Sequence, residues 1–496
     1  MRKRAPPPSR LARRIKVHDR HQFELKLEYQ PADGDRECRY VVEAFVCIPG
    51  NLNVAPETVP REELYNDIHN YVRLKTPNLS WSELGGLPSS PLVRLAEART
   101  DATFAYECKL LACVFRARLR DLGVEAEGLG GSGLARLVAS CTTTLDAVTS
   151  IVGQYRALGE RADLGESARA AYRLADEYMS VSLEHMLRRV IVAVARAGLP
   201  AAQAGDAAAL RRTLLDVILR EERYRQGLGL PSIIDPRSDN ERFIYRTGLL
   251  KKYCSSALFL ALRRAAARKR WQDLVYALAA GIAMTFFMAV AFWGQARDQG
   301  LAGLFVIPIV AYMFREHLKE AARGLFARLL ERGLYDRKMV IDDPAGGALG
   351  SLREKIAYVR RGEIPPDVAE LRRRDVDPII RIAEEELRET IVHYRKEIVL
   401  ARRRREGGAL TDIVRFHVQR FLHEMDEPDG EIEYVDAETH ELERVRAAKT
   451  YRVDVVFRFH ARVGQAPQTT LMRLVLDRNG IKRIERVDGG RLSTNP

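Results

Sequence analysis

The sequence lacks every short motif that would name a reaction. It contains no P-loop, no H-E-x-x-H zinc helix, no G-x-S-x-G nucleophile turn and no C-x-x-C pair. Its six cysteines also lack zinc-finger spacing with histidine, which predicts reduced, buried thiols of a cytosolic compartment. We therefore expect no catalytic residue, no metal ligand and no cofactor. These absences lean against an enzyme without excluding one, because catalytic groups are often distant in sequence.

Charge is nearly absent from residues 274–314, where Arg297 and Asp298 are the only charged residues. The run 274–296 holds 23 consecutive uncharged residues, and a helix needs about 20 apolar residues to cross a bilayer. It shows no polar face at helical spacing, unlike a core helix of a soluble domain. Trp293 near its end suits a water–lipid interface. This run predicts a transmembrane helix.

A second run, residues 299–314, has 16 uncharged residues. As a helix it would reach about 24 Å, whereas the hydrocarbon layer is about 30 Å thick. Arg315 could extend its charge to the interface, and Pro308 is tolerated in membrane helices. We expect this run to span as the second helix of a transmembrane hairpin, 274–314. A re-entrant or interfacial helix is the alternative.

The flanks of the hairpin predict its orientation. Ten basic residues lie on its two outer sides, and the connecting loop holds only Arg297. Because positive charge stays on the cytoplasmic side, both termini are expected in the cytoplasm. We expect a protein integral to a bacterial inner (cytoplasmic) membrane. The flanking residues are Arg263, Arg264, Arg268, Lys269, Arg270, Arg315, Lys319, Arg323, Arg328 and Arg332.

Small side chains recur every fourth residue within the first run and would form one face of its helix. Such a face lets another helix approach closely, which drives association in lipid. It predicts helix packing in the membrane, with either the second helix of the chain or another copy. The four residues are Ala277, Gly281, Thr285 and Ala289.

The predicted fold is membrane-anchored and predominantly α-helical, with an N-terminal β-hairpin and a small C-terminal α+β module. The β-hairpin is expected from alternating residues and an Asp33-Gly34 turn. The expected segments are a basic disordered arm (1–20), the β-hairpin (21–56), a helical cytoplasmic domain (57–262), the transmembrane hairpin (274–296 and 299–314), a juxtamembrane helix and linker (315–376), a long coiled-coil-like helix (377–406) and the α+β module (409–490).

The long helix 377–406 is expected to begin at Asp377 and carries an apolar seam from Ile380 to Ile398. Glu385, Glu389 and His393 would share a face of it, but arginines nearby favour a salt-bridged surface over a metal site. The module 409–490 is expected to pair an amphipathic helix with an antiparallel sheet, because residues 451–463 alternate and Asn479-Gly480 favours a turn.

Gly128, Gly130 and Gly133 formally match G-x-G-x-x-G. A nucleotide site of this kind requires a strand before the glycines and a helix after them. The preceding residues favour a helix, so we interpret the glycines as a connection between two helices.

The net charge of +13 indicates an anionic neighbour. The basic clusters lack interleaved aromatic residues, which disfavours nucleic acid and leaves membrane lipids as the expected partner. One cluster is the N-terminal arm. The other, an expected anionic-lipid contact, is Arg402, Arg403, Arg404 and Arg405.

These features favour a membrane-anchored cytoplasmic scaffold, adaptor or signalling component that binds a protein partner or forms homo-oligomers. The alternative is an enzyme at the membrane surface that acts on lipid or another anionic substrate.

Overall fold

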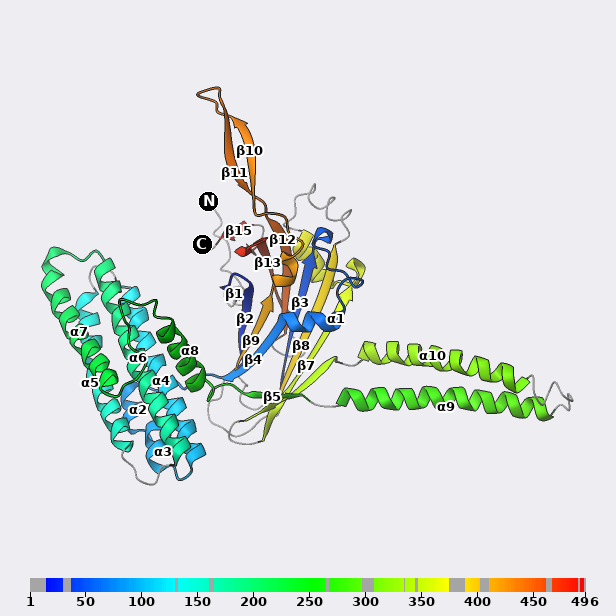
Figure 1. Ribbon diagram of the computed structural model, residues 1–496, viewed down its shortest axis with the longest axis horizontal. Coiled ribbons are helices and arrows are strands. Elements are labelled where there is room, and N and C mark those ends of the chain that lie inside the picture. Colours follow the sequence, from blue (N-terminus) through cyan, green and yellow to red (C-terminus); the bar gives the residue numbers. More distant parts are fainter. Residues whose placement is uncertain are drawn as a thin grey trace. The chain divides into compact units, whose positions relative to one another are not determined.

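The computed structural model divides the chain into two compact units (Figure 1). The first combines Met1–Val72 with Leu260–Pro496 and holds the strands, and the second, Arg73–Phe259, is helical. The helical unit is thus an insertion within the strand-rich unit. The residues that the structure describes are 15–29, 37–129, 133–159, 165–264, 267–296, 307–333, 335–343, 347–373, 389–401, 410–460, 466–488 and 491–494.

The fold mixes helix and strand, at about 51% and 29% of the residues that the structure describes. The prediction of a predominantly α-helical membrane protein is therefore wrong. Several strands are buried on both faces, and such strands lose the alternation of polar and apolar residues that marks a half-buried strand. Their apolar residues also occur at helical spacing, which explains the error.

Two main sheets build the strand-rich unit. Sheet A has the order β1-β2-β9-β4, and sheet B has nine strands in the order β15-β14-β13-β12-β3-β8-β7-β6-β5. Sheet A consists of β1 (Ile15–Asp19), β2 (Gln22–Tyr29), β4 (Ile68–Leu74) and β9 (Leu410–His417). Sheet B consists of β3 (Glu37–Ile48), β5 (Ala261–Arg264), β6 (Arg337–Asp342), β7 (Ala348–Val359), β8 (Thr390–Ala401), β12 (Tyr451–His460), β13 (Gln468–Asp477), β14 (Gly480–Asp488) and β15 (Arg491–Thr494).

Aromatic side chains join the two sheets face to face. Phe416 of sheet A lies against Tyr394 and Phe457 of sheet B, with ring centroids 5.9 Å apart in both pairs. Phe23 of sheet A stacks on Phe416 at 5.0 Å. All four rings are buried, and burying such a side chain contributes about 1.5–3 kcal/mol. This aromatic layer holds the sandwich together.

The predicted hairpin at 21–56 is wrong in its pairing, although both of its strands exist. β2 pairs with β1 and β9 in sheet A, whereas β3 pairs with β8 and β12 in sheet B. Alternation identifies a strand and its buried face, but it does not identify the partner strand.

The predicted long helix at 377–406 is wrong where the structure describes it. Residues 390–401 form β8, which is rich in β-branched residues and therefore favours a strand. Ile391 and Ile398, placed on one helical seam by their spacing, lie on opposite faces of β8, since residues seven apart in a strand point opposite ways. Residues 374–388 lie outside the described part of the chain.

The C-terminal residues 409–490 do not form a separate α+β module. The predicted amphipathic helix is β9, followed by only one short helix, α13 (Gln419–Leu422). β12 pairs with β3, so this region belongs to the same sandwich as the N-terminal strands. The alternation of β12 and the Asn479-Gly480 turn are confirmed, because β13 and β14 pair across that turn. The predicted linker within 315–376 contains β6, β7 and α11 (Pro366–Arg373).

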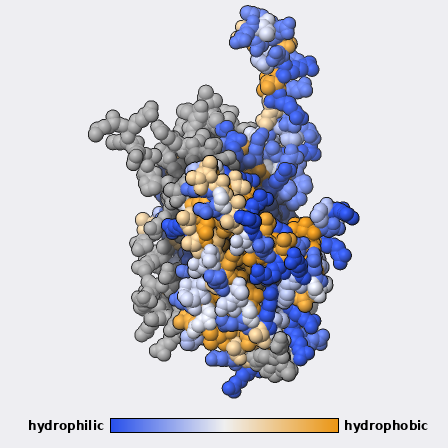
Figure 2. All heavy atoms as spheres, turned by 90° about the vertical axis from the view of Figure 1, so that its left-hand side faces the viewer, coloured by the Kyte–Doolittle hydropathy of each residue, from blue (hydrophilic) through white to orange (hydrophobic). Residues whose placement is uncertain are grey.

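A two-stranded ribbon, β10 (Asp429–Val435) with β11 (Leu442–Ala448), pairs with neither main sheet. One face carries ion pairs such as Arg444 with Glu433, and the other exposes the opposed pair Ile432 and Val445. In Figure 2 the ribbon extends upward as mostly hydrophilic residues with a few hydrophobic ones. A ribbon of this kind is only marginally stable by itself in water.

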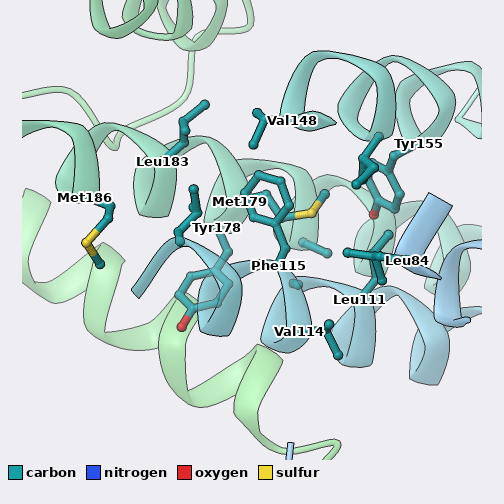
Figure 3. Close-up of a cluster of buried hydrophobic side chains, with 14 of the residues drawn as sticks. Leu84, Leu111, Val114, Phe115, Val148, Tyr155, Tyr178, Met179, Leu183 and Met186 are labelled. Carbon is teal, nitrogen blue, oxygen red and sulfur yellow. The ribbon is translucent and has the colours of Figure 1, made fainter. Parts of the chain in front are cut away.

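The helical unit packs its long helices around α6. Side chains such as Phe115, Tyr155 and Met179 form its buried core, which Figure 3 shows between the helices. Cap residues define the starts of the first helices, since Ser80 and Thr100 accept hydrogen bonds from backbone N–H groups. The helices are α2 (Trp81–Gly86), α3 (Pro91–Glu97), α4 (Asp101–Glu127), α5 (Leu134–Leu158), α6 (Glu166–Arg196), α7 (Ala204–Gly227) and α8 (Glu241–Ser255), and a short α1 (Arg61–Leu64) belongs to the strand-rich unit.

Candidate functional site

The feature that best indicates a function is a hairpin of two helices, α9 (Ala267–Ala296) and α10 (Ile307–Gly333). It connects β5 to β6, and these strands are antiparallel neighbours in sheet B, with Arg264 opposite Met339. The chain therefore leaves the sheet, forms the helical hairpin and returns to the adjacent strand. Figure 1 shows the two helices side by side.

Two contacts fix the register of this hairpin. The rings of Phe287 and Tyr312 meet edge to face at 6.3 Å. The Arg323 guanidinium lies over the Tyr276 ring at 4.6 Å. Both contacts describe the same antiparallel register. Tyr276 lies eleven residues before Phe287 on α9, and Arg323 lies eleven residues after Tyr312 on α10.

Among the described side chains of α9 and α10, the fully buried hydrophobic ones are small. Ala279, Ala283 and Ala311 are buried where α9 and α10 meet. Large apolar side chains point outward instead, and a contiguous exposed apolar surface is typical of a site that contacts protein or membrane. The exposed apolar residues are Tyr276, Leu278, Ile282, Met284, Phe286, Met288, Phe292 and Trp293 on α9 and Ile309, Val310, Tyr312, Met313, Phe314 and Leu325 on α10.

The predicted small-residue face lies elsewhere on α9. Ala277, Gly281, Thr285 and Ala289 are exposed, whereas α10 packs near Ala279 and Ala283. The Thr285 hydroxyl donates to the Gly281 carbonyl at 2.9 Å, so its polar group is satisfied within the helix. The second helix of the chain is thus not the partner of this face, and packing against another copy stays a prediction.

Among the described residues, one helix is long and apolar enough to cross a membrane, namely α9 over Tyr276–Trp293. The prediction of two transmembrane helices is therefore wrong. Of the second predicted run, 299–306 lie outside the described residues, and α10 is apolar only as far as Phe314 before Arg315 and Glu316 follow.

A cluster of charged residues on sheet B centres on Glu43, which sequence reasoning missed. Its carboxylate lies 3.3 Å from His393, 3.4 Å from Arg395, 3.1 Å from Arg458 and 3.1 Å from His460. β3, β8 and β12 bring these residues together, and pairing of distant strands leaves no local sequence signal. The cluster could bind an anion through its basic groups.

Burial alone would raise the pKa of the Glu43 carboxyl, but its contacts with His393, His460 and Arg395 lower that pKa from 4.5 to about 2. The ionised form therefore stabilises the fold above the pKa of the unfolded chain. This stabilisation is lost as pH falls from about 5 towards 2. A difference of this size corresponds to about 3 kcal/mol at neutral pH.

We expect Glu43→Gln to lower the free energy of unfolding of the sandwich by about 3 kcal/mol at neutral pH. The difference from the wild type should shrink as pH falls below 5. Calorimetric unfolding between pH 2 and pH 7 measures it, with the exposed Glu424→Gln as control. A difference that does not change with pH would contradict the assigned low pKa.

A second polar group lies inside the sandwich. Lys396 and Asp412 are both fully buried and form an ion pair between sheets B and A. The Lys396 ammonium also donates to Asn70 at 2.6 Å, and the Tyr29 hydroxyl donates to Asp412 at 3.2 Å. Asn70 in turn bonds Glu354 at 2.5 Å. In a strand, residues two apart share a face, so Lys396 lies on an apolar face of β8 between Tyr394 and Ile398. A lysine on such a face indicates a buried charge, but this pattern is visible only when residues 390–401 are interpreted as a strand.

A row of buried acids on α6 holds the helical unit together. Arg156 of α5 pairs with Asp176 at 3.1 Å, and Arg246 of α8 pairs with Glu177 at 2.6 Å. The fully buried Arg225 of α7 pairs with Glu184. Each of these acids is neutralised by an arginine from another helix, so the row joins the bundle rather than forming a ligand site.

The other predicted residues are placed as follows. Arg402, Arg403, Arg404 and Arg405, and most of the N-terminal arm, lie outside the described residues, so their lipid contact stays a prediction. Glu389 pairs with Arg372 at 2.5 Å and His393 belongs to the Glu43 cluster, while Glu385 is outside the described part. Gly128 ends α4 and Gly133 precedes α5, which confirms a connection between helices.

In the part of the chain that the structure describes, no group of three or more His, Cys, Asp or Glu could hold a metal ion. None of the six cysteines forms a disulfide bond.

Comparison with known proteins finds no match. No family model, no curated protein and no solved structure matches this chain.

Proposed function

We propose that this protein is a membrane-anchored scaffold, adaptor or signalling component in which the α9–α10 hairpin is the anchor. The observation that carries the proposal is the surface of that hairpin, where large apolar side chains point outward along both helices. Lipid acyl chains would cover this surface. The hairpin has a polar, charged base and an apolar far part, as a membrane anchor requires.

Both ends of the hairpin leave the membrane on the same side in this proposal. β5 and β6 pair with each other in sheet B, so the chain enters and returns at one surface. The basic flanking residues favour the cytoplasmic surface of a bacterial inner membrane. The sandwich and the helical unit then lie in the cytoplasm with both termini.

We expect the full chain to remain with the membrane pellet after washes with high salt and with alkaline carbonate, and to be released by detergent. Apolar burial survives these washes, whereas attraction to anionic headgroups is screened by salt. Fractionation of cells that express the chain measures this. Release by salt alone would contradict anchoring by the hairpin.

A second candidate function is an enzyme that acts on an anionic substrate at the membrane surface. The Glu43 cluster favours it, because His393, His460 and two arginines converge there. Its central carboxylate, however, has a pKa of about 2 and would not take up a proton at neutral pH. Affinity capture of the full chain from detergent extract, with mass spectrometry, separates the two. A scaffold should recover a protein partner, and an enzyme should recover a bound anionic molecule that His460→Ala releases.

A further inference from the structure

The register of the hairpin places the charged residues of α10 beside the apolar window of α9, which is the stretch Tyr276–Trp293. Phe287 lies level with Tyr312, and Tyr276 lies level with Arg323. Counting three residues from the first contact puts Met284 level with Arg315. The first half of the apolar window therefore faces a charged part of α10. The charged residues of that part are Arg315, Glu316, Lys319, Glu320 and Arg323.

These charges decide how far the hairpin can enter a bilayer. If Tyr276–Trp293 filled the hydrocarbon layer, Met284 would lie near its middle and bring Arg315 there. Five charged residues would then be in or near hydrocarbon. A charged residue at the centre of a membrane helix costs about 2.5–3.5 kcal/mol by insertion scales, and Arg315 and Glu316 would lie closest to the centre. The charges pair with one another, with Glu316 3.1 Å from both Arg315 and Lys319, which reduces this cost without removing it.

A shifted position avoids most of the cost. If the headgroups lie at the level of Met284 and Arg315, all five charges are in the headgroup layer or in water. Only Arg297 and Asp298, adjacent and opposite in charge, then follow α9 into the membrane. The shifted position therefore places two charged residues in the membrane, whereas the spanning position places five in or near hydrocarbon.

The exposed apolar side chains agree with the shifted position. Beyond the level of Met284, α9 exposes Phe286, Met288, Phe292 and Trp293, and α10 exposes large apolar side chains as far as Phe314. Before that level, α9 still exposes Tyr276, Leu278 and Ile282, but the part of α10 beside them is charged. Both helices therefore expose large apolar side chains together only beyond the level of Met284.

The part of α9 beyond this level is too short to cross a bilayer. From Met284 to the end of α9 at Ala296 the helix rises about 18 Å, whereas the hydrocarbon layer is about 30 Å thick. We infer that the hairpin inserts from one side only, with headgroups at the level of Met284 and Arg315 and its end inside the hydrocarbon layer. This inference rests on the proposed membrane anchoring. It specifies that the hairpin contacts the lipids of one leaflet and the ends of the acyl chains at the bilayer centre.

The depth of two positions on α9 tests the inference. Trp293 lies nine residues beyond Met284, about 13.5 Å deep and near the bilayer centre if the inference holds. If α9 spans, Trp293 lies near the far headgroups and Met284 lies near the centre. The two arrangements therefore exchange the depths of these positions.

The experiment uses the full chain in vesicles of phosphatidylcholine that carries bromine either near the headgroup end or near the tail end of its acyl chains. The variant Trp271→Phe leaves Trp293 as the tryptophan of the hairpin. The double variant Trp271→Phe/Trp293→Phe has no tryptophan in the hairpin and measures the fluorescence of Trp81 alone. Adding Met284→Trp to this double variant places a tryptophan at position 284. We expect tail-end bromine to quench Trp293 most, and headgroup-end bromine to quench the tryptophan at position 284 most.

The reverse order at both positions would overturn the inference and leave membrane anchoring intact. Absence of quenching by either lipid at both positions would overturn membrane anchoring itself, and the inference with it. Trp293 and Met284 are exposed, so neither Trp293→Phe nor Met284→Trp removes a buried contact of the sandwich or of the helical core.

Discussion

Replacing Lys396 with methionine should destabilise the sandwich by about 3–5 kcal/mol, because removal of one partner of a buried ion pair leaves the other charge buried and unpaired. Lys396 and Asp412 are fully buried, and the methionine could bond neither Asp412 nor Asn70. The loss should appear in both sheets, since the pair joins β8 of sheet B to β9 of sheet A.

Hydrogen exchange of peptides from β8 and β9 measures the effect. A loss of about 3–5 kcal/mol speeds global exchange by roughly a hundredfold or more. The control is Lys482→Met on β14, an exposed position where a substitution changes stability by about 0.5 kcal/mol or less. Adding Asp412→Asn to Lys396→Met should recover part of the loss, because it removes the unpaired charge. Equal exchange in Lys396→Met and Lys482→Met would show that the ion pair does not join the sheets.

Local patterns in the sequence predict some elements of this fold correctly. The uncharged run 274–296 corresponds to α9, and the alternation from Tyr451 to Phe459 corresponds to β12. The Asn479-Gly480 turn is also correct, because Gly480 adopts a positive φ that favours glycine. In each case the signal is contained within one element or one turn.

Pairing between distant strands could not be predicted in the same way. β3 lies between β8 and β12, which follow it by more than three hundred residues, so no local pattern identifies these neighbours. The Glu43 cluster depends on that pairing and was missed with it. β8 was interpreted as a helix because it is covered on both faces, which removes the alternation that identifies a strand.

The depth of the membrane hairpin required the register of its helices. The sequence shows that α10 becomes charged at Arg315, but it does not show which part of α9 lies beside that residue. The contacts of Phe287 with Tyr312 and of Tyr276 with Arg323 supply this information. From this register we infer that the proposed membrane hairpin enters from one side rather than spanning.

Excision of the helical hairpin should abolish membrane association at high salt. Because β5 and β6 are adjacent antiparallel strands, a short Gly/Ser linker in place of residues 267–333 can connect them without altering sheet B. The matched control excises the ribbon Asp429–Ala448, whose ends are joined by a hydrogen bond of 2.9 Å from Lys449 N–H to the Pro428 carbonyl. Both variants lose an exposed hairpin, but only the first loses the apolar helices.

Flotation with vesicles at high salt is the measurement that tests this account most directly. High salt suppresses attraction between basic residues and anionic headgroups, so that only apolar burial holds protein on the vesicles. We predict that the full chain and the variant without the ribbon float with the vesicles, and that the variant without residues 267–333 stays folded in the soluble fraction. Flotation of that last variant to the same extent as the full chain would contradict the claim that α9 and α10 anchor this protein.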